Sequence, residues 1–339
     1  MIFEHESTGC FHASTEVLSL RDVRTIGRGC SPSDALNMSR HGLPSRKHQN
    51  ESTVAVPTRT GIGLALGGGF ARGFAHLGVL QVFEQNNIPI THIAGTSVGS
   101  ILGAAYASGA PLARIIETCR TLRFRDIARW RVSRLGLASN QRLENLIERV
   151  FESRQFEDLR IPLAVVATDL TSGEPVVFTQ GNLVDAIRAS CAFPGLFEPV
   201  EIGTRCLADG GLVAPVPTRA ARDLGATTVI GVSVGIQDGH RGAPTNIFQV
   251  VSRAVSAAQK HQLEIWERHA DLVLRPDVQS LAWDDFHRAD EAIEAGASAA
   301  RRALPRIAKL LGQQDDAAQH FQARLEAEDK SYLWLAEVH

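Results

Sequence analysis

One five-residue segment restricts the fold of this chain more than any other feature: residues 95–99 read Gly-Thr-Ser-Val-Gly. They follow the apolar stretch 91–94 and precede a second apolar run at 101–106. A serine among small residues at such a junction predicts a strand that turns sharply into a helix, which lifts the serine oxygen clear of the sheet. Ser97 is therefore a candidate nucleophile, although plain tight turns have the same composition. The residues that would shape this turn are Gly95, Thr96, Val98 and Gly99.

Apolar runs alternate with helical patterns over much of the chain. Buried strands are predicted at 62–66, 163–167 and 228–234, and shorter ones at 206–208 and 272–274. The helices predicted among them lie at about 73–85, 111–121, 141–151, 182–190 and 217–224. Strands that alternate with helices predict an α/β fold with a mostly parallel central sheet flanked by helices.

The character of the chain changes at two places. Residues 1–58 are rich in Ser, Thr, His, Arg and Gly, and we expect them to be disordered or loosely attached. Residues 59–235 are expected to form the catalytic core, and residues 236–339 a mostly helical extension packed on it. The elements predicted in this extension are a helix at 246–269 and a helical stretch at 287–328 with interruptions at Pro305 and Gly312.

Composition argues against several classes of protein. Hydrophobic side chains make up 44% of the 339 residues, and the formal charge of -2 gives no general electrostatic reason to bind nucleic acid. The chain starts without the basic and apolar regions of a secretory signal, and no apolar run approaches ~18 residues. We therefore expect a soluble, cytoplasmic protein. The five cysteines lack CxxC spacing and acidic pairs lack oxygen-ligand spacing, so we expect free thiols and no metal or other cofactor.

A glycine-rich segment follows the first predicted strand, about thirty residues before Ser97. It contains Gly67, Gly68, Gly69, Phe70, Ala71, Arg72 and Gly73. Glycines between a strand and a helix leave backbone N–H groups free to hold an anion or a developing oxyanion. Other interpretations are a dinucleotide loop, which lacks its acidic residue about twenty positions later, a phosphate loop, which lacks the Gly-Lys-Ser ending, and a tight turn.

A third element, Asp209 followed by Gly210 and Gly211, comes directly after the short strand predicted at 206–208. A carboxylate at a strand end can act as a base for a serine, and glycines after it let another loop approach. Taken alone, Asp-Gly-Gly is usually a simple turn.

Together the three elements resemble the patatin-like phospholipase family, whose signature is a GXGXXG oxyanion loop, a GXSXG nucleophile elbow and a DG[AG] motif. The resemblance spans about residues 61–235 and includes the stretch 190–195, which is similar to the segment the family carries ahead of its aspartate. Residues 66–80 resemble the bacterial and neuropathy-target-esterase-like branch. The resemblance implies a three-layer α/β/α fold. Phe70 stands where glycine is usual, which leaves open which N–H groups of 67–70 contact the oxyanion.

The family works with a Ser–Asp dyad without histidine, so the resemblance implies Ser97 as nucleophile and Asp209 as general base. It implies a serine ester hydrolase, active in lipid metabolism, that cleaves fatty-acyl esters of phospholipids or lysophospholipids. The alternative is a non-catalytic lipid-binding or regulatory member of the same fold. Arg72 is expected to hold the oxyanion loop or to meet a phosphate.

Histidines are the other candidate partners of Ser97. We interpret His76 and His92 as surface or packing residues, because neither stands on a loop after a late strand. His240 and His287 stay open as alternatives.

Basic and aromatic residues alternate at 120–134. Such a segment suits an anionic membrane interface, and an amphipathic segment packed on the domain is the alternative interpretation. The hypothesis is peripheral contact, at the inner face of the membrane, through Arg125, Arg129 and Trp130. The sequence does not indicate an oligomeric state.

Overall fold

The computed structural model describes residues 61–131, 133–235 and 243–336, with side chains except at position 248 and from 313 onward. The predictions for residues 1–58 and for His240 lie outside the described residues. The boundary predicted near residue 235 stays a prediction.

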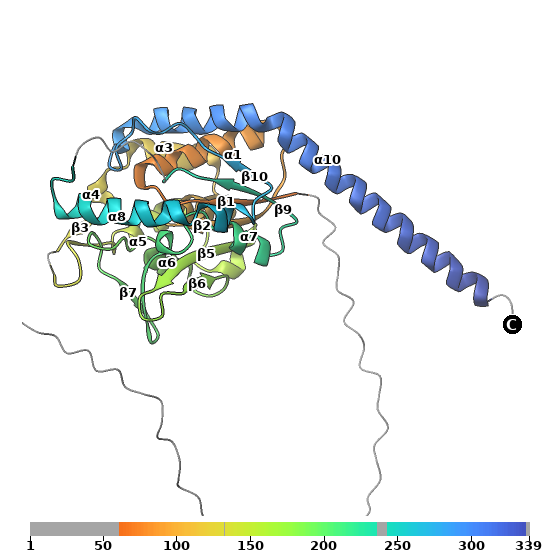
Figure 1. Ribbon diagram of the computed structural model, residues 1–339, viewed down its shortest axis with the longest axis horizontal. Helices are drawn as coiled ribbons and strands as arrows, with labels where there is room; N and C mark the ends of the chain where they lie inside the picture. Colours follow the sequence, from red (N-terminus) through yellow and green to blue (C-terminus); the bar gives the residue numbers. More distant parts are fainter. Residues whose placement is uncertain (1–60, 132, 236–242, 337–339) are drawn as a thin grey trace, which may run out of the picture. The chain divides into compact units, whose positions relative to one another are not determined.

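The centre of the fold is an eight-stranded mixed sheet in the order β10-β9-β1-β2-β5-β8-β7, with β6 paired to β5 (Figure 1). Five strands from β10 to β5 run parallel, and β6, β8 and β7 are antiparallel to their neighbours. The predicted mostly parallel α/β architecture is therefore confirmed. The strand bounds are β1 Ile62–Leu66, β2 Ile90–Thr96, β5 Leu163–Asp169, β6 Pro175–Phe178, β7 Val200–Ile202, β8 Arg205–Asp209, β9 Thr228–Val232 and β10 Leu272–Leu274.

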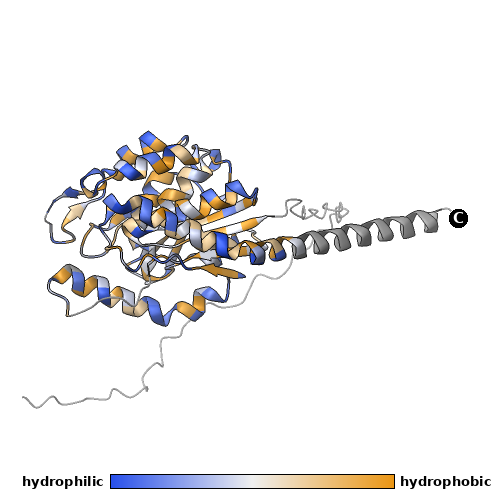
Figure 2. Ribbon diagram, turned by 90° about the horizontal axis from the view of Figure 1, so that it is seen from above, coloured by the Kyte–Doolittle hydropathy of each residue, from blue (hydrophilic) through white to orange (hydrophobic). Residues whose placement is uncertain are grey.

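Helices cover both faces of this sheet. Successive side chains of a buried strand point to opposite faces, so both faces are apolar and both must be shielded from water. In β1, Leu64 and Leu66 belong to the larger apolar cluster, whereas Ala65 belongs to a smaller one with Trp266. The larger cluster contains α1 Ala75–Gln85, α2 Val98–Ala107, α3 Leu112–Thr121, α5 Leu143–Val150 and α6 Leu183–Ser190. The smaller contains α7 Thr218–Asp223 and α9 Leu263–Glu267. Figure 2 shows hydrophilic and hydrophobic residues mixed along these helices, as burial of one face requires.

The C-terminal helices differ from the sequence prediction in two respects. The helix predicted at 246–269 is divided at Gln262 into α8 Ile247–His261 and α9. The interruptions predicted at Pro305 and Gly312 are wrong, because α10 is continuous over Ala289–Ala336. Proline cannot donate to the carbonyl four residues earlier, here that of Arg301. Both Pro305 and Arg301 are exposed, so water can hydrate that carbonyl.

Several short elements complete the described chain. A helical turn, α4 Phe124–Ile127, leads into a hairpin of β3 Arg129–Trp130 and β4 Ala138–Ser139. The 3₁₀ turns are η1 Phe70–Phe74, η2 Phe156–Asp158, η3 Gly210–Leu212 and η4 Phe286–Arg288. Within the described ranges, no helix has both the length and the apolar character needed to cross a membrane.

Candidate active site

Ser97 occupies a strained turn between the end of β2 and the start of α2. Its φ of 54° and ψ of -126° lie outside the regions that most L-residues adopt. The two flanking glycines are sterically required. A Cβ on Gly95 would lie 2.5 Å from Ser100 Cα, and one on Gly99 would lie 2.1 Å from the carbonyl oxygen of Leu66. Strand, turn and helix thus present the serine hydroxyl above the carboxyl ends of the parallel strands.

Asp209 meets this serine from the antiparallel side of the sheet. It is the last residue of β8 and pairs in register with Ala167 of β5. The hydroxyl of Ser97 donates to Asp209 Oδ2 at 2.7 Å, and the backbone N–H of Gly211 donates to Oδ1 at 2.7 Å. Gly210 keeps this turn close to the sheet, since a Cβ there would lie 2.1 Å from the carbonyl oxygen of Val166. Residues 112 positions apart in sequence therefore form one hydrogen-bonded pair.

Burial controls the charge state of this carboxyl group. Loss of solvation raises the pKa of Asp209 to about 6, and the hydrogen bonds from Ser97 and Gly211 partly oppose this rise. A carboxylate with a raised pKa is a stronger base than an exposed one. At neutral pH Asp209 is ionised and able to accept the proton of Ser97.

The glycine-rich loop lies beside Ser97, and a Cβ on Gly68 would be 3.2 Å from Ser97 Cβ. The first two N–H groups of the loop are already used: Gly67 donates to Val232 O at 3.1 Å, and Gly68 donates to Pro215 O at 3.1 Å. The N–H groups of Gly69 and Phe70 make no hydrogen bond to another described residue. These two groups are therefore free to meet an oxyanion.

Phe70 has a φ of 51°, which explains why glycine suits its position. Its ring packs edge-on against Phe193 and Trp283, at centroid distances of 5.4 and 5.2 Å. This packing stabilises a conformation that phenylalanine otherwise disfavours. Gly73 follows in the same turn, and a Cβ there would lie 2.3 Å from a methyl group of Val98.

Within the described chain, Ser97 and Asp209 form no hydrogen bond with a histidine. His92 contacts the hydroxyl of Thr91 at 3.0 Å, and His287 lies in η4. His76 is completely buried, contrary to a surface position, and its Nε2–H donates to the carbonyl of Gly67 at 2.8 Å. Burial lowers the pKa of His76 to about 4, so the ring is neutral and fastens the start of the glycine loop.

Ser190 is a site residue whose role the sequence did not indicate. Its hydroxyl oxygen accepts the backbone N–H of Ser97 at 2.9 Å and donates to the carbonyl of Val166 at 2.6 Å. It stands in the stretch 190–195, so the family resemblance is the signal that could have drawn attention to it. No periodicity or charge pattern predicts this bridge, since it depends on how α6 packs on β5.

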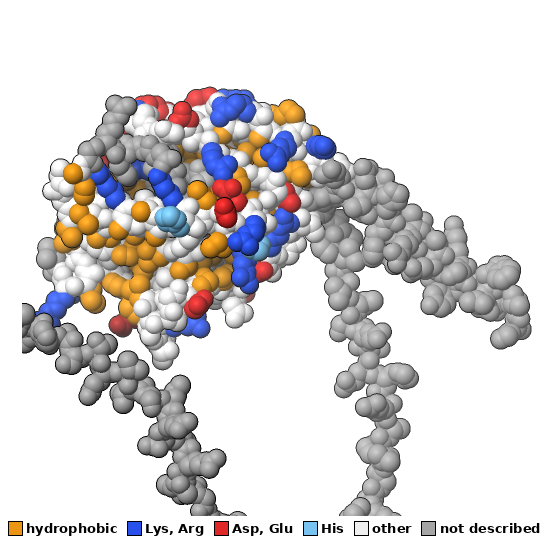
Figure 3. Space-filling view, viewed as in Figure 1, with side chains coloured by type: hydrophobic (Ala, Val, Ile, Leu, Met, Phe, Trp, Pro, Cys, Tyr) orange, Lys and Arg blue, Asp and Glu red, His pale blue; other side chains and the backbone are white. Residues whose placement is uncertain are grey.

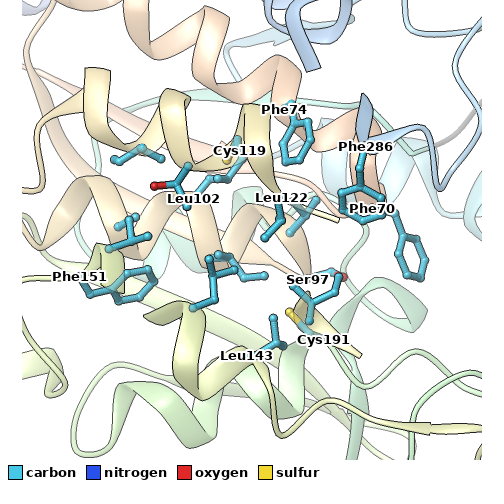
Figure 4. Close-up of a pocket in the computed structure, with 18 of the residues that line it drawn as sticks. Phe70, Phe74, Ser97, Leu102, Cys119, Leu122, Leu143, Phe151, Cys191 and Phe286 are labelled. Atoms are coloured by element: carbon cyan, nitrogen blue, oxygen red, sulfur yellow. The ribbon is translucent and has the colours of Figure 1, made fainter. Parts of the chain in front are cut away.

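An apolar pocket extends from Ser97 into the core. Its lining comes chiefly from α2, α3 and α5, with a void of about 60 Å³. In Figure 4, Ser97 and Phe151 lie on opposite sides of the cluster of apolar side chains. Most atoms that face the void are carbon, so the pocket suits a hydrocarbon chain. The residues that line its length include Ile101, Leu102, Ala105, Leu143, Leu146 and Phe151.

On the solvent side, Ser97 and Asp209 open into a vestibule of about 70 Å³ beneath α8, whose lining is both polar and apolar. A groove of about 790 Å³ adjoins it, and Arg72, Ser252 and Trp283 line both spaces. Burial lowers the pKa of Arg72, an effect that the charge of Asp285 partly opposes. Arg72 Nε is buried without a hydrogen-bond partner in the described structure. The guanidinium group therefore lies at the junction of the two spaces.

The residues predicted to contact a membrane lie on two short neighbouring elements. Arg125 is in α4, and Arg129 and Trp130 form β3; all three are exposed. Trp130 lines the groove directly. Among the described residues, no three His, Cys, Asp or Glu side chains are grouped as a metal site would require.

Residues 64–222 match the patatin-like phospholipase family model. An uncharacterized NTE family protein of Mycobacterium tuberculosis is 37% identical over 176 residues, which cover 51% of this chain and 49% of that protein. The patatin-like phospholipase domain-containing protein 6 of Mus musculus is 34% identical over 201 residues, 57% of this chain and 15% of that protein. The chain thus spans about half the length of its mycobacterial relative and a small part of the mouse protein.

Among solved structures, VipD from Legionella pneumophila aligns with 74% of this chain and 67% of its own, at 14% identity and a TM-score of 0.44. The assignment of the fold to the patatin-like class rests on the family match and on the sheet described above.

Proposed function

Since residues 64–222 belong to the patatin-like phospholipase family, we propose that this chain is a serine lipolytic acyl hydrolase that cleaves fatty-acyl esters of phospholipids or lysophospholipids. One observation carries the proposal: the hydrogen bond of 2.7 Å between Ser97 Oγ and Asp209 Oδ2, at the junction of an apolar pocket and the vestibule. Peripheral contact with a membrane, at its cytoplasmic face, is part of the proposal.

In the proposed reaction, Asp209 accepts the proton of Ser97 while the serine oxygen attacks the ester carbonyl. The oxygen–carbon bond forms, the carbonyl π electrons move to oxygen, and collapse of this intermediate expels the alcohol, which takes the proton from Asp209. Water then repeats the sequence on the acyl-enzyme and releases the fatty acid. Because one carboxyl group both accepts and returns the proton, no histidine is needed.

Stabilisation of the oxyanion is assigned to the N–H groups of Gly69 and Phe70. Both are free of other described partners and line the vestibule with Ser97. The positive end of the α2 dipole, which starts at Val98, adds to the potential there. Loss of one oxyanion donor costs about 3 kcal/mol in other acyl-transfer enzymes, so this loop would account for a large part of the rate.

The two spaces on either side of Ser97 support a lipid as the substrate. The apolar pocket would take the acyl chain, and the vestibule and groove, which offer polar as well as apolar groups, would take the alcohol part with its head group. Arg72, at their junction, is suited to an anionic group such as a phosphodiester.

The test is covalent labelling with a fluorophosphonate, followed by hydrolysis of a panel of phospholipids, lysophospholipids and simple esters. Wild type should label and hydrolyse lipids, Ser97→Ala should do neither, and Asp209→Asn should be strongly slowed in both. Ser108→Ala is the matched control, because Ser108 is also buried and its hydroxyl also joins two backbone groups, donating to the carbonyl of Ala105 and accepting the N–H of Glu152. Labelling that survives in Ser97→Ala rejects the proposed nucleophile. Lipid binding without labelling or hydrolysis would favour a non-catalytic lipid-binding protein.

A further inference from the structure

The mouth of the groove has the chemistry of a lipid interface. We propose that the β3–β4 hairpin and the N-terminal half of α8 together form a docking surface for an anionic lipid bilayer, called here the rim. The rim would hold the active site against the bilayer from which lipid enters. This inference deepens the proposed function, since it names the form in which the substrate is presented.

Exposed apolar side chains are concentrated on the rim. Seven large hydrophobic side chains are exposed in the described part of the chain, and four of them lie on these two elements. Leu135 in the hairpin turn is 67% exposed and Trp130 in β3 is 67% exposed. On α8, Ile247 is 71% and Val250 is 46% exposed, one turn apart. Trp130 and Ile247 also line the same groove, which places the two elements next to each other.

The charge of the rim complements an anionic surface. Residues 127–143 contain four arginines and residues 243–263 contain Arg253 and Lys260, while neither segment contains an aspartate or glutamate. The arginines of the hairpin segment are Arg129, Arg131, Arg134 and Arg142. The first three are exposed and form no ion pair with a described residue. Carboxylates near the rim include Asp284 on the groove wall and Asp126, which accepts the N–H of Arg123.

The combination of these side chains favours a bilayer over a protein partner. Apolar rings and stems can enter the boundary between head groups and acyl chains while guanidinium groups meet phosphates. Figure 3 shows hydrophobic side chains, with Lys and Arg among them, on the face that carries β3 and α8 in Figure 1. A second copy of the chain would meet the same surface with its own arginines, which would repel.

The groove connects the rim to the catalytic pair. Its lining includes the exposed side chains of Trp130 and Ile247, and it shares Arg72, Ser252 and Trp283 with the vestibule of Ser97. Helix α8 covers the vestibule and has no fully buried side chain among those described. Its attachment near the C-terminal end includes the hydrogen bond of 2.7 Å from Gln259 Nε2 to the carbonyl of Gly211. A lipid lifted from a bilayer at the rim therefore has a short path beneath α8 to Ser97.

The experiment measures binding of the full chain to phosphatidylcholine vesicles with and without phosphatidylglycerol, by co-sedimentation. Wild type should bind the vesicles that contain phosphatidylglycerol more tightly, and about 1 M salt should weaken this binding. Arg131→Gln and Arg134→Gln should each weaken it about fivefold. Leu135→Ser should weaken it severalfold. Equal binding to both vesicles, or unchanged binding by all three variants, would overturn the proposal.

Two controls separate the rim from the rest of the surface. Ile265→Ser removes an exposed apolar side chain of α9, and Arg219→Gln removes an exposed charge of α7. Both should bind vesicles as wild type does, and losses equal to those of the rim variants would contradict a localised surface. If wild type sediments as a dimer that Leu135→Ser dissociates while vesicle binding is unchanged, the rim is an interface between copies and the proposal fails.

The experiment distinguishes a loss of membrane binding from a loss of catalysis. Leu135, Arg131 and Arg134 line none of the cavities at Ser97, so their variants should hydrolyse a short, soluble ester at the wild-type rate. Ser97→Ala should bind vesicles normally while hydrolysing nothing. Quenching by brominated phospholipids adds a direct readout: Trp130→Phe should lose a component of tryptophan quenching that wild type shows, and undiminished quenching would contradict insertion of Trp130.

Discussion

Ser190 Oγ accepts the backbone N–H of Ser97 at 2.9 Å, although 93 residues separate the two serines. The same oxygen donates its proton to the carbonyl of Val166 at 2.6 Å, so the hydroxyl is fixed at both ends. It thereby joins the nucleophile turn to the central strand β5. Because Ser97 has a positive φ, this hydrogen bond stabilises a conformation that the chain alone would disfavour.

Ser190→Ala should therefore slow the acylation of Ser97. Loss of the bridge leaves a buried N–H and a buried carbonyl without partners, at a cost of about 1–3 kcal/mol each. We expect the rate of fluorophosphonate labelling to fall roughly tenfold to a hundredfold, with kcat falling more than KM changes. Ser108→Ala should lose comparable unfolding free energy without slower labelling. If both variants label at the wild-type rate, Ser190 has only a structural role.

The raised pKa of Asp209 predicts the acid limb of the pH–rate profile. Only the ionised carboxylate can accept the serine proton, so kcat/KM on a soluble ester should rise with pH through about 6 and then level off. An ordinary carboxyl group would place this limb nearer pH 4. Asp209→Asn should lower kcat/KM by about three orders of magnitude and abolish the limb. A limb that persists in the residual activity of Asp209→Asn would assign it to another group.

The contribution of Asp209 to the unfolding free energy changes with pH in the opposite direction to its contribution to the rate. A carboxyl pKa that is higher in the folded than in the unfolded chain gives a contribution that is fully present at low pH and is lost as pH rises from about 4 to about 6. The unfolding free energy of wild type relative to Asp209→Asn should thus fall by roughly 3 kcal/mol over this interval. Denaturant unfolding at several pH values measures it, and a constant difference would show that the carboxyl group is not desolvated.

His76→Gln and His76→Leu test the anchor of the glycine loop. Glutamine can still donate to the carbonyl of Gly67, whereas leucine fills the space without a donor. We expect labelling within a fewfold of wild type for glutamine and about tenfold slower for leucine. Equal rates in both variants would show that the hydrogen bond is not needed to place the loop.

His76 also has a signature in stability. Its pKa is about 4 in the folded protein and about 6.5 when unfolded, so its contribution is lost as pH falls through this range. Wild type should lose roughly 3 kcal/mol more than His76→Gln between pH 7 and pH 4. Asp209 is present in both chains, so its opposite effect cancels in this comparison. Denaturant unfolding at the two pH values gives the difference, and equal losses would place His76 in contact with water.

The candidate catalytic residues could be predicted because each stands within a short local sequence pattern. Ser97 and Asp209 follow strands and precede or accompany glycines, and the structure brings their oxygens to 2.7 Å. Ser190 and His76 could not be assigned their roles, since their partners are determined by packing between distant elements. Phe70 departs from the glycine pattern, and only its ring contacts with Phe193 and Trp283 show how the fold tolerates it.

The strands and helices likewise divide into those that a local sequence pattern predicts and those that it does not. Buried parallel strands such as β1 and β5 are predictable, because β1 and the first five residues of β5 form uninterrupted apolar runs. The antiparallel strands β6 and β7 are short and partly exposed. Their Val, Ile and Phe residues favour a strand, but runs of three or four residues give too short a pattern to predict one. The continuity of α10 through Pro305 depends on solvent exposure at Arg301, which a sequence pattern does not reveal.

The apolar pocket should select the length of the acyl chain, and Ala105 is the residue that tests this. It lies eight residues after Ser97, so the rise of a helix places it about 12 Å along α2. A larger side chain there would meet the acyl chain near its eighth to tenth carbon, by the same order-of-magnitude estimate. Ala105→Leu should lower kcat/KM for longer esters about tenfold and leave butyryl esters unchanged.

Two further variants complete this test. Ala107→Leu is the matched control, because Ala107 is equally buried on α2 but does not line the pocket. Both leucine variants should lose about 1–3 kcal/mol of stability by overpacking, but only Ala105→Leu should change the chain-length profile. Leu146→Ala enlarges the pocket from α5 and should shift preference toward longer chains. If Ala105→Leu and Ala107→Leu give the same profile, the acyl chain does not occupy this pocket.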